Sequence, residues 1–171
     1  MSEIIITPVQ PSPRIRGALS GILVEAVAHG GSVSFMHPLD SGVAQAFWDG
    51  ALASAARGER IVLGAWDGEV LAGTVSLLLD CPPNQPHRAE IAKLITRASH
   101  RGRGVGTALM QAAEQVAVAR GRTLLVLDTA VEGGASALYE RLGFTLAGII
   151  PDYALKPYGG LTGTKIYWKK L

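Results

Sequence analysis

The chain has 171 residues, of which 48% are hydrophobic, 18% charged and 6% aromatic. This composition is typical of a soluble α/β protein and excludes a disordered or fibrous one, and the length suits one core, so we expect a single domain over 1–171. A formal net charge of +2 excludes the broad positive field that nucleic-acid binding requires, so any anion site must be local.

The N-terminal part of the chain predicts a strand, a helix and a loop. The β-branched run EIIITPV at 3–9 predicts a strand, which the prolines that follow it end. Apolar residues spaced three and four apart predict a helix over 15–26. The segment GGSVSFMHPLD at 30–40 predicts an irregular loop.

A second helix and a β-hairpin follow. Asp40 or Ser41 is expected to cap a helix that ends near Gly58, because either side chain can accept a hydrogen bond from the first turn. The apolar runs 60–66 and 70–79 flank an Asp-Gly pair, which is a strong hairpin signal.

A strand, a glycine-rich stretch, a helix and another strand form the central unit. We expect strands over 88–96 and 123–128, joined by a helix that ends at Gly121. This order makes the two strands parallel. Because TLLVLD at 123–128 is apolar without alternation, we expect that strand to be covered on both faces.

The C-terminal part predicts a short helix over 135–142, ended by Gly143, and two closing strands at 145–150 and 164–170. The whole order is strand, two helices, three strands, helix, strand, helix and two strands. It is the order of an α/β protein with no internal repeat.

Cysteine and histidine usage limits the chemistry. Cys81 is the only cysteine, which excludes an internal disulfide, and the four histidines lack metal-ligand spacing, so we expect no metal. The N-terminus lacks a signal-peptide pattern, and no run of 18 apolar residues occurs. We therefore expect a cytoplasmic protein with no membrane or nucleic-acid partner.

The stretch HRGRGVGTALM at 100–110 predicts an anion site. A helix N-terminus presents unpaired N–H groups and partial positive charge, and glycines remove the Cβ atoms that would block a diphosphate. A tight strand-to-helix turn is the alternative explanation for these glycines. A P-loop is excluded because no GK[ST] follows, and the dinucleotide pattern GxGxxG fails because Thr107 or Leu109 stands at its last glycine.

Two motifs carry a family resemblance. Arg101, Gly104 and Gly106 form RxxGxG, and with LYERLGF at 138–144 they resemble the GNAT superfamily of N-acetyltransferases. GGSVSFMHPL, NQPHRAEIAKL, LLVLDT and IPDYAL further resemble the tabtoxin-resistance acetyltransferase branch. The resemblance implies an α/β GNAT fold: a mixed, mostly antiparallel sheet of about seven strands with a central parallel pair, flanked by four helices.

The resemblance also implies the cofactor and its contacts. Acetyl-CoA is the expected acetyl donor, and the backbone amides near Leu94 and Ile95 are expected to face the acetyl carbonyl and pantetheine. The expected pyrophosphate contacts are Arg101, Gly102, Arg103, Gly104, Val105, Gly106 and Thr107. Glu132 stands where many relatives carry Asn, which puts one polar contact in doubt.

Three residues are candidates for proton transfer. An amine of pKa ~10.4 is mostly protonated at neutral pH, so a base must deprotonate it. Glu90, on the strand before the glycine stretch, is the first candidate, and Asp128, at the end of the next strand, is the rival. Tyr139 resembles the family tyrosine that protonates the CoA thiolate, although its helical spacing also suits a core residue.

The resemblance to the tabtoxin-resistance branch implies that the acceptor is a small, amino-acid-like primary amine and that the protein acts in antibiotic or toxin resistance. The family resemblance implies that the amine attacks directly in a ternary complex. Its pocket is expected to draw on Phe35, His37, Asn84, His87 and Arg88. A homodimer of this chain is one possible assembly. Two other functions stay open: a CoA-binding sensor with the same fold but weak catalysis, and a dinucleotide-binding oxidoreductase.

Overall fold

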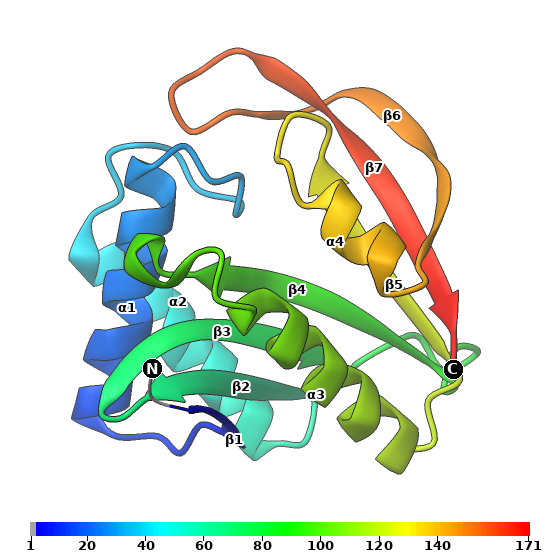
Figure 1. Ribbon diagram of the computed structural model, residues 1–171, viewed down its shortest axis with the longest axis horizontal. Helices are drawn as coiled ribbons and strands as arrows, with labels where there is room; N and C mark the ends of the chain where they lie inside the picture. The colour runs from blue at the N-terminus through cyan, green and yellow to red at the C-terminus, as the bar shows by residue number, and fades with distance from the viewer. Residues whose placement is uncertain (1–2) are drawn as a thin grey trace.

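The computed structural model describes residues 3–171, and within them seven strands form one sheet in the order β1-β2-β3-β4-β5-β7-β6 (Figure 1). The strands are β1 (Ile4–Pro8), β2 (Arg60–Asp67), β3 (Val70–Leu78), β4 (Arg88–Thr96), β5 (Leu124–Ala130), β6 (Thr145–Leu155) and β7 (Leu161–Lys170). The helices are α1 (Pro13–Ala28), α2 (Ser41–Ala56), α3 (Val105–Ala119) and α4 (Ser136–Arg141), with a short 3-10 turn η1 (Ala98–His100).

Only β4 and β5 pair in parallel among the described strands, and every other neighbouring pair is antiparallel. The expected mixed sheet of seven strands with four helices and one central parallel pair is therefore confirmed. The helix α3 makes the crossover between the two parallel strands, as a parallel connection requires.

Local sequence signals explain where the elements begin and end. Asp40, one of the two expected caps, accepts hydrogen bonds from the amides of Gly42 and Val43 and so starts α2. Gly68 has a φ of 59° in the turn between β2 and β3, where an L side chain is disfavoured. Gly121 and Gly143 have positive φ just after α3 and α4, as expected of residues that end a helix.

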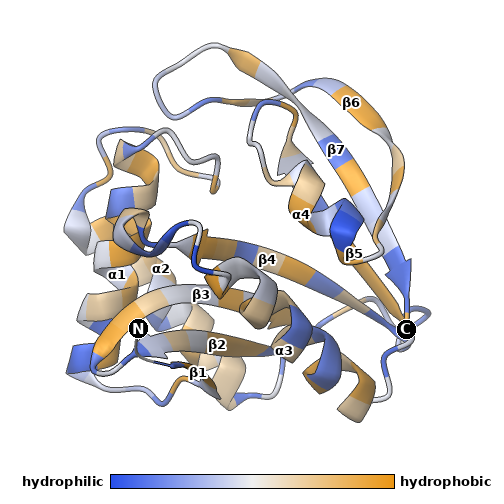
Figure 2. Ribbon diagram, viewed as in Figure 1, coloured by the Kyte–Doolittle hydropathy of each residue, from blue (hydrophilic) through white to orange (hydrophobic). Residues whose placement is uncertain are grey.

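Two core layers lie on opposite faces of the sheet. The helices α1 and α2 cover one face, where Trp48 and Leu19 are fully buried. The helix α3 covers the other face, where Leu109 and Tyr167 are fully buried. Figure 2 shows hydrophobic colours along β2, β3 and β5 and on parts of β4.

The expectation that 123–128 is covered on both faces is wrong. In β5 only Leu125 and Leu127 are buried, whereas Leu124 and Val126 are partly exposed and Asp128 is exposed. The buried side chains of β5 belong to the α3 layer, whereas the strands that contribute buried residues to the α1 and α2 layer are β2, β3 and β4. The strand therefore presents one face to a core and the other to solvent.

The end of the chain also departs from the predicted boundaries. The closing strands are longer than the predicted ones, at Thr145–Leu155 and Leu161–Lys170. The last strand, β7, lies between β5 and β6 and leaves β6 at the edge of the sheet. Within residues 3–171, no helix is long and apolar enough to cross a membrane.

Candidate active site

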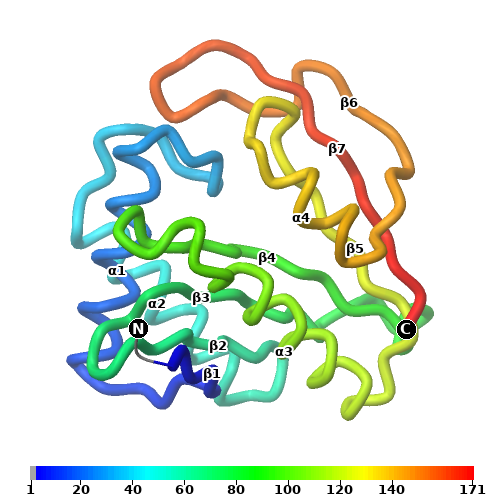
Figure 3. Tube along the Cα trace, viewed as in Figure 1, coloured from blue at the N-terminus to red at the C-terminus, as the bar shows by residue number. Residues whose placement is uncertain are grey.

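A cavity of about 660 Å³ lies where β4 and β5 diverge. The two strands pair over only three residues, from Arg88 opposite Leu124 to Glu90 opposite Val126. Beyond that point their paths separate, as the tube in Figure 3 shows. The cavity is lined by the rest of both strands, by 29–34 and by residues near α4, and its volume suits a small-molecule site.

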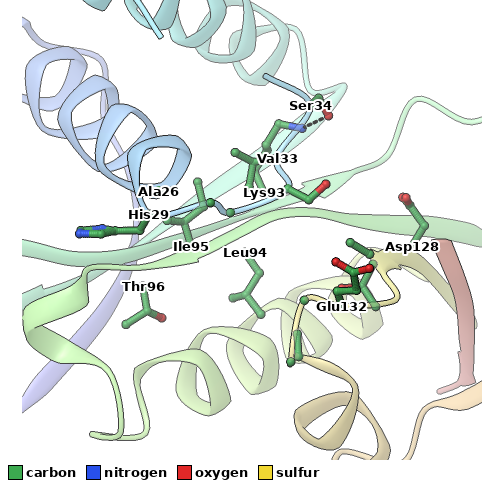
Figure 4. Close-up of a pocket in the computed structure, with 18 of the residues that line it drawn as sticks. Ala26, His29, Val33, Ser34, Lys93, Leu94, Ile95, Thr96, Asp128 and Glu132 are labelled. Carbon is green, nitrogen blue, oxygen red and sulfur yellow. Dashed lines mark hydrogen bonds between the residues drawn. The ribbon is translucent and has the colours of Figure 1, made fainter. Parts of the chain in front are cut away.

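The divergence leaves one side of β4 without a strand partner from Ile91 onward. Leu94 and Ile95 belong to this segment and both line the cavity (Figure 4). Their side chains belong to opposite layers, since Leu94 packs against the α3 core and Ile95 lies in the α1 and α2 core. The free edge of β4 can therefore hydrogen-bond an extended, amide-containing ligand from within the sheet.

The glycine stretch forms the loop that enters α3. Gly102 and Gly104 have φ of 73° and 78°, values that L side chains rarely adopt, and Gly104 is the residue that precedes the helix. The first amides of α3, at Val105, Gly106 and Thr107, have no intrahelical acceptors, and no side chain caps them. This terminus has the geometry and polarity that bind a phosphate.

At the start of α3, Gly106 leaves space for a ligand, whereas Val105 offers a ligand only its backbone amide. A Cβ on Gly106 would lie no closer than 3.4 Å to a protein atom, so the protein itself leaves space there. The side chain of Val105 is 1% exposed and belongs to the core, which leaves only its backbone amide for a ligand.

The two arginines of the loop have different partners. Arg101 is exposed and lines the cavity. Arg103 lies 3.0 Å from the carboxylate of Asp67, which also lies 3.1 Å from Nε2 of the buried His100. The last residue of β2 thus fixes the loop through a carboxylate shared by His100 and Arg103, and Arg101 is the arginine placed toward the cavity.

Gly73 on β3 lets α3 approach the sheet closely. A Cβ at this position would lie 2.8 Å from the side chain of Val105 and 2.9 Å from the carbonyl oxygen of Ile95. These contacts are too short for carbon, so the start of α3 can sit at this height above the sheet only over a glycine. The sequence placed Asp67 only in a hairpin turn and did not single out Gly73, because both act here through residues distant in the chain.

Tyr139 lines the cavity and is 6% exposed. Its ring packs against Phe144 and Tyr167, with centroids 6.0 and 5.9 Å away. Its hydroxyl has no hydrogen-bond partner within residues 3–171. Burial, reinforced by the charge of Asp128, raises the pKa of Tyr139 to about 12, so the phenol stays protonated at neutral pH and can donate a hydrogen bond.

The two candidate bases are placed differently. Asp128 lines the cavity and accepts a hydrogen bond from the Thr164 hydroxyl at 3.2 Å. Glu90 is not among the lining residues; its carboxylate lies 3.5 Å from Arg88 and its side chain is 39% exposed. The structure brings Asp128 together with Tyr139, and it leaves Glu90 just before the strands separate.

The expected acceptor residues fall into two groups. Phe35 packs edge-on against Phe47, and His37 stacks on Tyr158 at 4.3 Å, so the loop 30–40 closes against the end of the β6–β7 hairpin. Neither residue lines the cavity, although Val33 and Ser34 of the same loop do.

The second group lies at the start of β4. Asn84, His87 and Arg88 are not among the residues that line the cavity, and Arg88 donates to Gln85 at 2.6 Å. The first residue of β4 that reaches the cavity is Ile91, which follows the last paired residue. The structure therefore separates these residues from Asp128 and Tyr139.

The acidic and basic groups at the rim form one ion pair. Glu132 lines the cavity and lies 3.3 Å from Lys156. Glu132 is therefore already paired with a cation, Lys156 of the β6–β7 hairpin. Among the described residues, no group of three or more histidine, cysteine, aspartate or glutamate side chains could hold a metal ion.

Comparison with known families and sequences bears on this site. Residues 33–144 match the model of the Acetyltransferase (GNAT) family, which spans β4, the glycine loop, α3, β5 and α4. N-acetyltransferase 8B from Rattus norvegicus is 34% identical over 90 residues, covering 50% of this chain and 40% of that protein. The matched parts of the curated relatives span between 25% and 54% of their lengths.

Solved structures share the whole fold. Ribosomal-protein-alanine N-acetyltransferase from Brucella melitensis superposes with a TM-score of 0.83 at 21% identity, over 98% of this chain and 99% of that one. A Salmonella typhimurium protein described as an acetyltransferase, solved with its cofactor acetyl-CoA, gives a TM-score of 0.80 at 20% identity over 98% and 94%. At these identities the likeness concerns the fold.

Proposed function

The chain belongs to the GNAT acetyltransferase family, and on that premise we propose that it is an enzyme that moves an acetyl group from acetyl-CoA to the primary amine of a small, amino-acid-like molecule. The observation that carries the proposal is the gap between β4 and β5, which joins the glycine loop at the start of α3 to a cavity holding both Asp128 and Tyr139. The proposal treats residues 1–171 as one catalytic domain.

The residues present fit acetyl-CoA. The uncapped amides of α3 and the exposed Arg101 suit a pyrophosphate, and Gly102 and Gly104 hold the loop in a conformation that turns its backbone toward an anion. The free edge of β4 at Leu94 and Ile95 suits the pantetheine amides. When bound, acetyl-CoA supplies the acetyl group as a reactive thioester.

Asp128 is proposed as the base that prepares the amine. Its carboxylate lines the cavity, and its Oδ1 atom has no hydrogen-bond partner within residues 3–171, so it can accept the proton of an acceptor ammonium. Glu90 stays the alternative, acting through water from beside the cavity. Neither carboxylate needs to form a covalent bond, because the amine attacks the acetyl carbon directly.

Tyr139 is proposed to donate its phenolic hydrogen to the departing sulfur. A pKa of about 12 keeps the hydroxyl protonated, so it can stabilise negative charge through a hydrogen bond. Complete proton transfer to a thiolate whose acid has a pKa of ~8.5 would be uphill. The role of Tyr139 is therefore stabilisation of the leaving group, and the proton released by the amine can reach the sulfur through solvent.

The resemblance to the tabtoxin-resistance branch supports an amino-acid-like acceptor and a role in toxin or antibiotic resistance. The single cysteine, Cys81, is consistent with a cytoplasmic location. A protein N-terminus is the alternative acceptor, since the Brucella melitensis enzyme is named for an alanine of ribosomal protein. A homodimer is supported by β6, an edge strand on which Ile149, Tyr153 and Leu155 are more than half exposed.

The proposed function is tested by thiol release from acetyl-CoA across a panel of free amino acids, polyamines and a peptide with an N-terminal alanine. Transfer to at least one amine is expected. Tight binding of acetyl-CoA without release for any amine would favour a sensor. Thermal stabilisation by NADH and not by acetyl-CoA would favour an oxidoreductase, because a ligand that binds only the native state raises its stability.

A further inference from the structure

One cation in the cavity has no part in the function proposed above. Lys93 lines the cavity from β4 and is only partly exposed. Its ammonium donates a hydrogen bond to the hydroxyl of Ser34 at 3.1 Å (Figure 4). It also lies 5.5 Å from the centre of the Phe47 ring. Within residues 3–171 it forms no ion pair with any carboxylate.

The backbone pays a conformational cost to place this side chain. Lys93 has a φ of 54° and Ser34 a φ of 76°, and both lie in the left-handed region that L side chains rarely adopt. Lys93 lies in a bulge, since the pairing between β3 and β4 shifts between Ala92 opposite Ser76 and Ile95 opposite Thr74. Strain of this kind gathers at functional sites, and here two strained residues meet in one hydrogen bond.

The bulge directs Lys93 to the face of the sheet that α1 and α2 cover, and we place the acceptor on this side. Its contacts come from α2 and from the loop 30–40, whereas the neighbouring Leu94 packs toward α3. Asp128 lies on the same side, because it alternates with Leu127 of the α3 core. A cation and an anion thus line the acceptor half of the cavity, more than 4 Å apart and not paired with each other.

The charge of Lys93 is poorly compensated. Burial lowers the pKa of its ammonium, while the charge of Asp128 raises it, Arg60 lowers it and Glu90 raises it. An ammonium that loses water without gaining a counter-ion is costly, and a bound anion would remove that cost. The geometry and the missing partner both indicate a place for a negatively charged group.

We infer that Lys93, with Ser34, binds a carboxylate of the acceptor, so that the enzyme selects amines that carry an acidic group and rejects their neutral analogues. This inference rests on the proposed acetyltransferase function and adds the charge of its acceptor. The acceptor then spans the cavity, with its amine toward Asp128 and its carboxylate toward Lys93. Lys93 determines specificity here and takes no part in the chemical step.

The test compares α-, β- and γ-amino acids with their carboxamides, in the wild type and in Lys93→Met. The measured quantity is the ratio of kcat/KM for each acid to kcat/KM for its amide, because comparing ratios between variants cancels the difference in amine pKa within each pair. A lost charge-assisted hydrogen bond is expected to lower this ratio about 10- to 100-fold. Lys93→Arg should restore part of it.

Two controls separate specificity from damage. Lys170→Met removes an exposed lysine of β7 that does not line the cavity, and it should leave the ratio unchanged. Lys93→Met should keep the wild-type Kd for acetyl-CoA and should lose far more activity on acids than on amides. A variant that loses acid and amide activity equally would assign Lys93 to general cavity structure and overturn the inference.

The two proposals fail in different ways. If the wild type transfers acetyl groups to amides as well as to acids, and Lys93→Met does not change that balance, the acceptor carboxylate is refuted while the acetyltransferase stands. If no amine of any charge releases thiol from acetyl-CoA, the proposed function itself is wrong, and the inference about Lys93 falls with it.

Discussion

The substitution Tyr139→Phe removes one oxygen atom from the cavity and leaves the ring in place. The aromatic contacts with Phe144 and Tyr167 stay, and the hydroxyl has no protein partner within residues 3–171, so folding should be nearly unaffected. A hydrogen bond to a charged group contributes about 1.5–3 kcal/mol, which corresponds to roughly a 10- to 150-fold lower kcat. The Kd of acetyl-CoA should change less than about threefold, because the bond forms only as charge develops on sulfur.

The assay is steady-state thiol release at saturating acceptor, together with calorimetric binding of acetyl-CoA. Tyr167→Phe is the matched control, since it removes a buried hydroxyl that donates to Glu140 at 2.9 Å and does not line the cavity. That variant should lose about 1 kcal/mol of stability and keep its kcat. Equal kcat for Tyr139→Phe and the wild type would return Tyr139 to a core role.

The raised pKa of Tyr139 adds a pH-dependent test of the same residue. Its folded-state pKa of about 12 exceeds the ordinary value of 10.0, so the native state resists deprotonation. The associated stability is intact below about pH 10 and is lost as pH rises toward 12, by about 3 kcal/mol in all. Denaturant unfolding should show this extra loss in the wild type and not in Tyr139→Phe; identical pH profiles would contradict the buried, neutral phenol.

Three further outcomes follow from the site. Asp128→Asn should lower kcat/KM at pH 7 about 100-fold and recover part of it at high pH, whereas Glu90→Gln should change it less than about fivefold; the reverse order would make Glu90 the base. Gly73→Ala places a Cβ atom 2.8 Å from the side chain of Val105 and 2.9 Å from the carbonyl oxygen of Ile95. We expect the free energy of unfolding in urea to fall by about 1–3 kcal/mol and acetyl-CoA binding to weaken. An unchanged Kd for acetyl-CoA would refute the positioning role of Gly73. Gly104→Ala, at a φ of 78°, should cost about 1 kcal/mol and raise the Kd of acetyl-CoA, as calorimetry would measure.

The sequence by itself determined the order of the elements and the loop that suits a diphosphate. Both depend on patterns within short stretches, such as helical spacing, an Asp-Gly turn and three glycines at a helix start. Local conformational preferences act between residues close in the chain, so they can be predicted from the sequence without the tertiary structure. The family resemblance used the same local stretches, and the match over 33–144 agrees with it.

The placement of the candidate bases could not be read in this way. Glu90 lies near the start of one predicted strand and Asp128 at the end of the next, and the sequence does not show which of the two carboxylates faces the acceptor. The pairing of β4 with β5 ends at Glu90, which leaves that carboxylate before the gap and Asp128 within it. Where two strands separate depends on how helices and later strands pack, and this is a property of the assembled sheet.

The same reason explains what was missed. Lys93 is an ordinary lysine in a strand pattern, and only the bulge opposite β3 turns it toward Ser34, a residue 59 positions away. Gly73 matters because α3 crosses above it, and Asp67 because the loop after η1 reaches back to it. Local sequence thus specifies the loop that suits the cofactor, and long-range packing decides which side chains face the acceptor, because those contacts join segments that meet only in the folded chain.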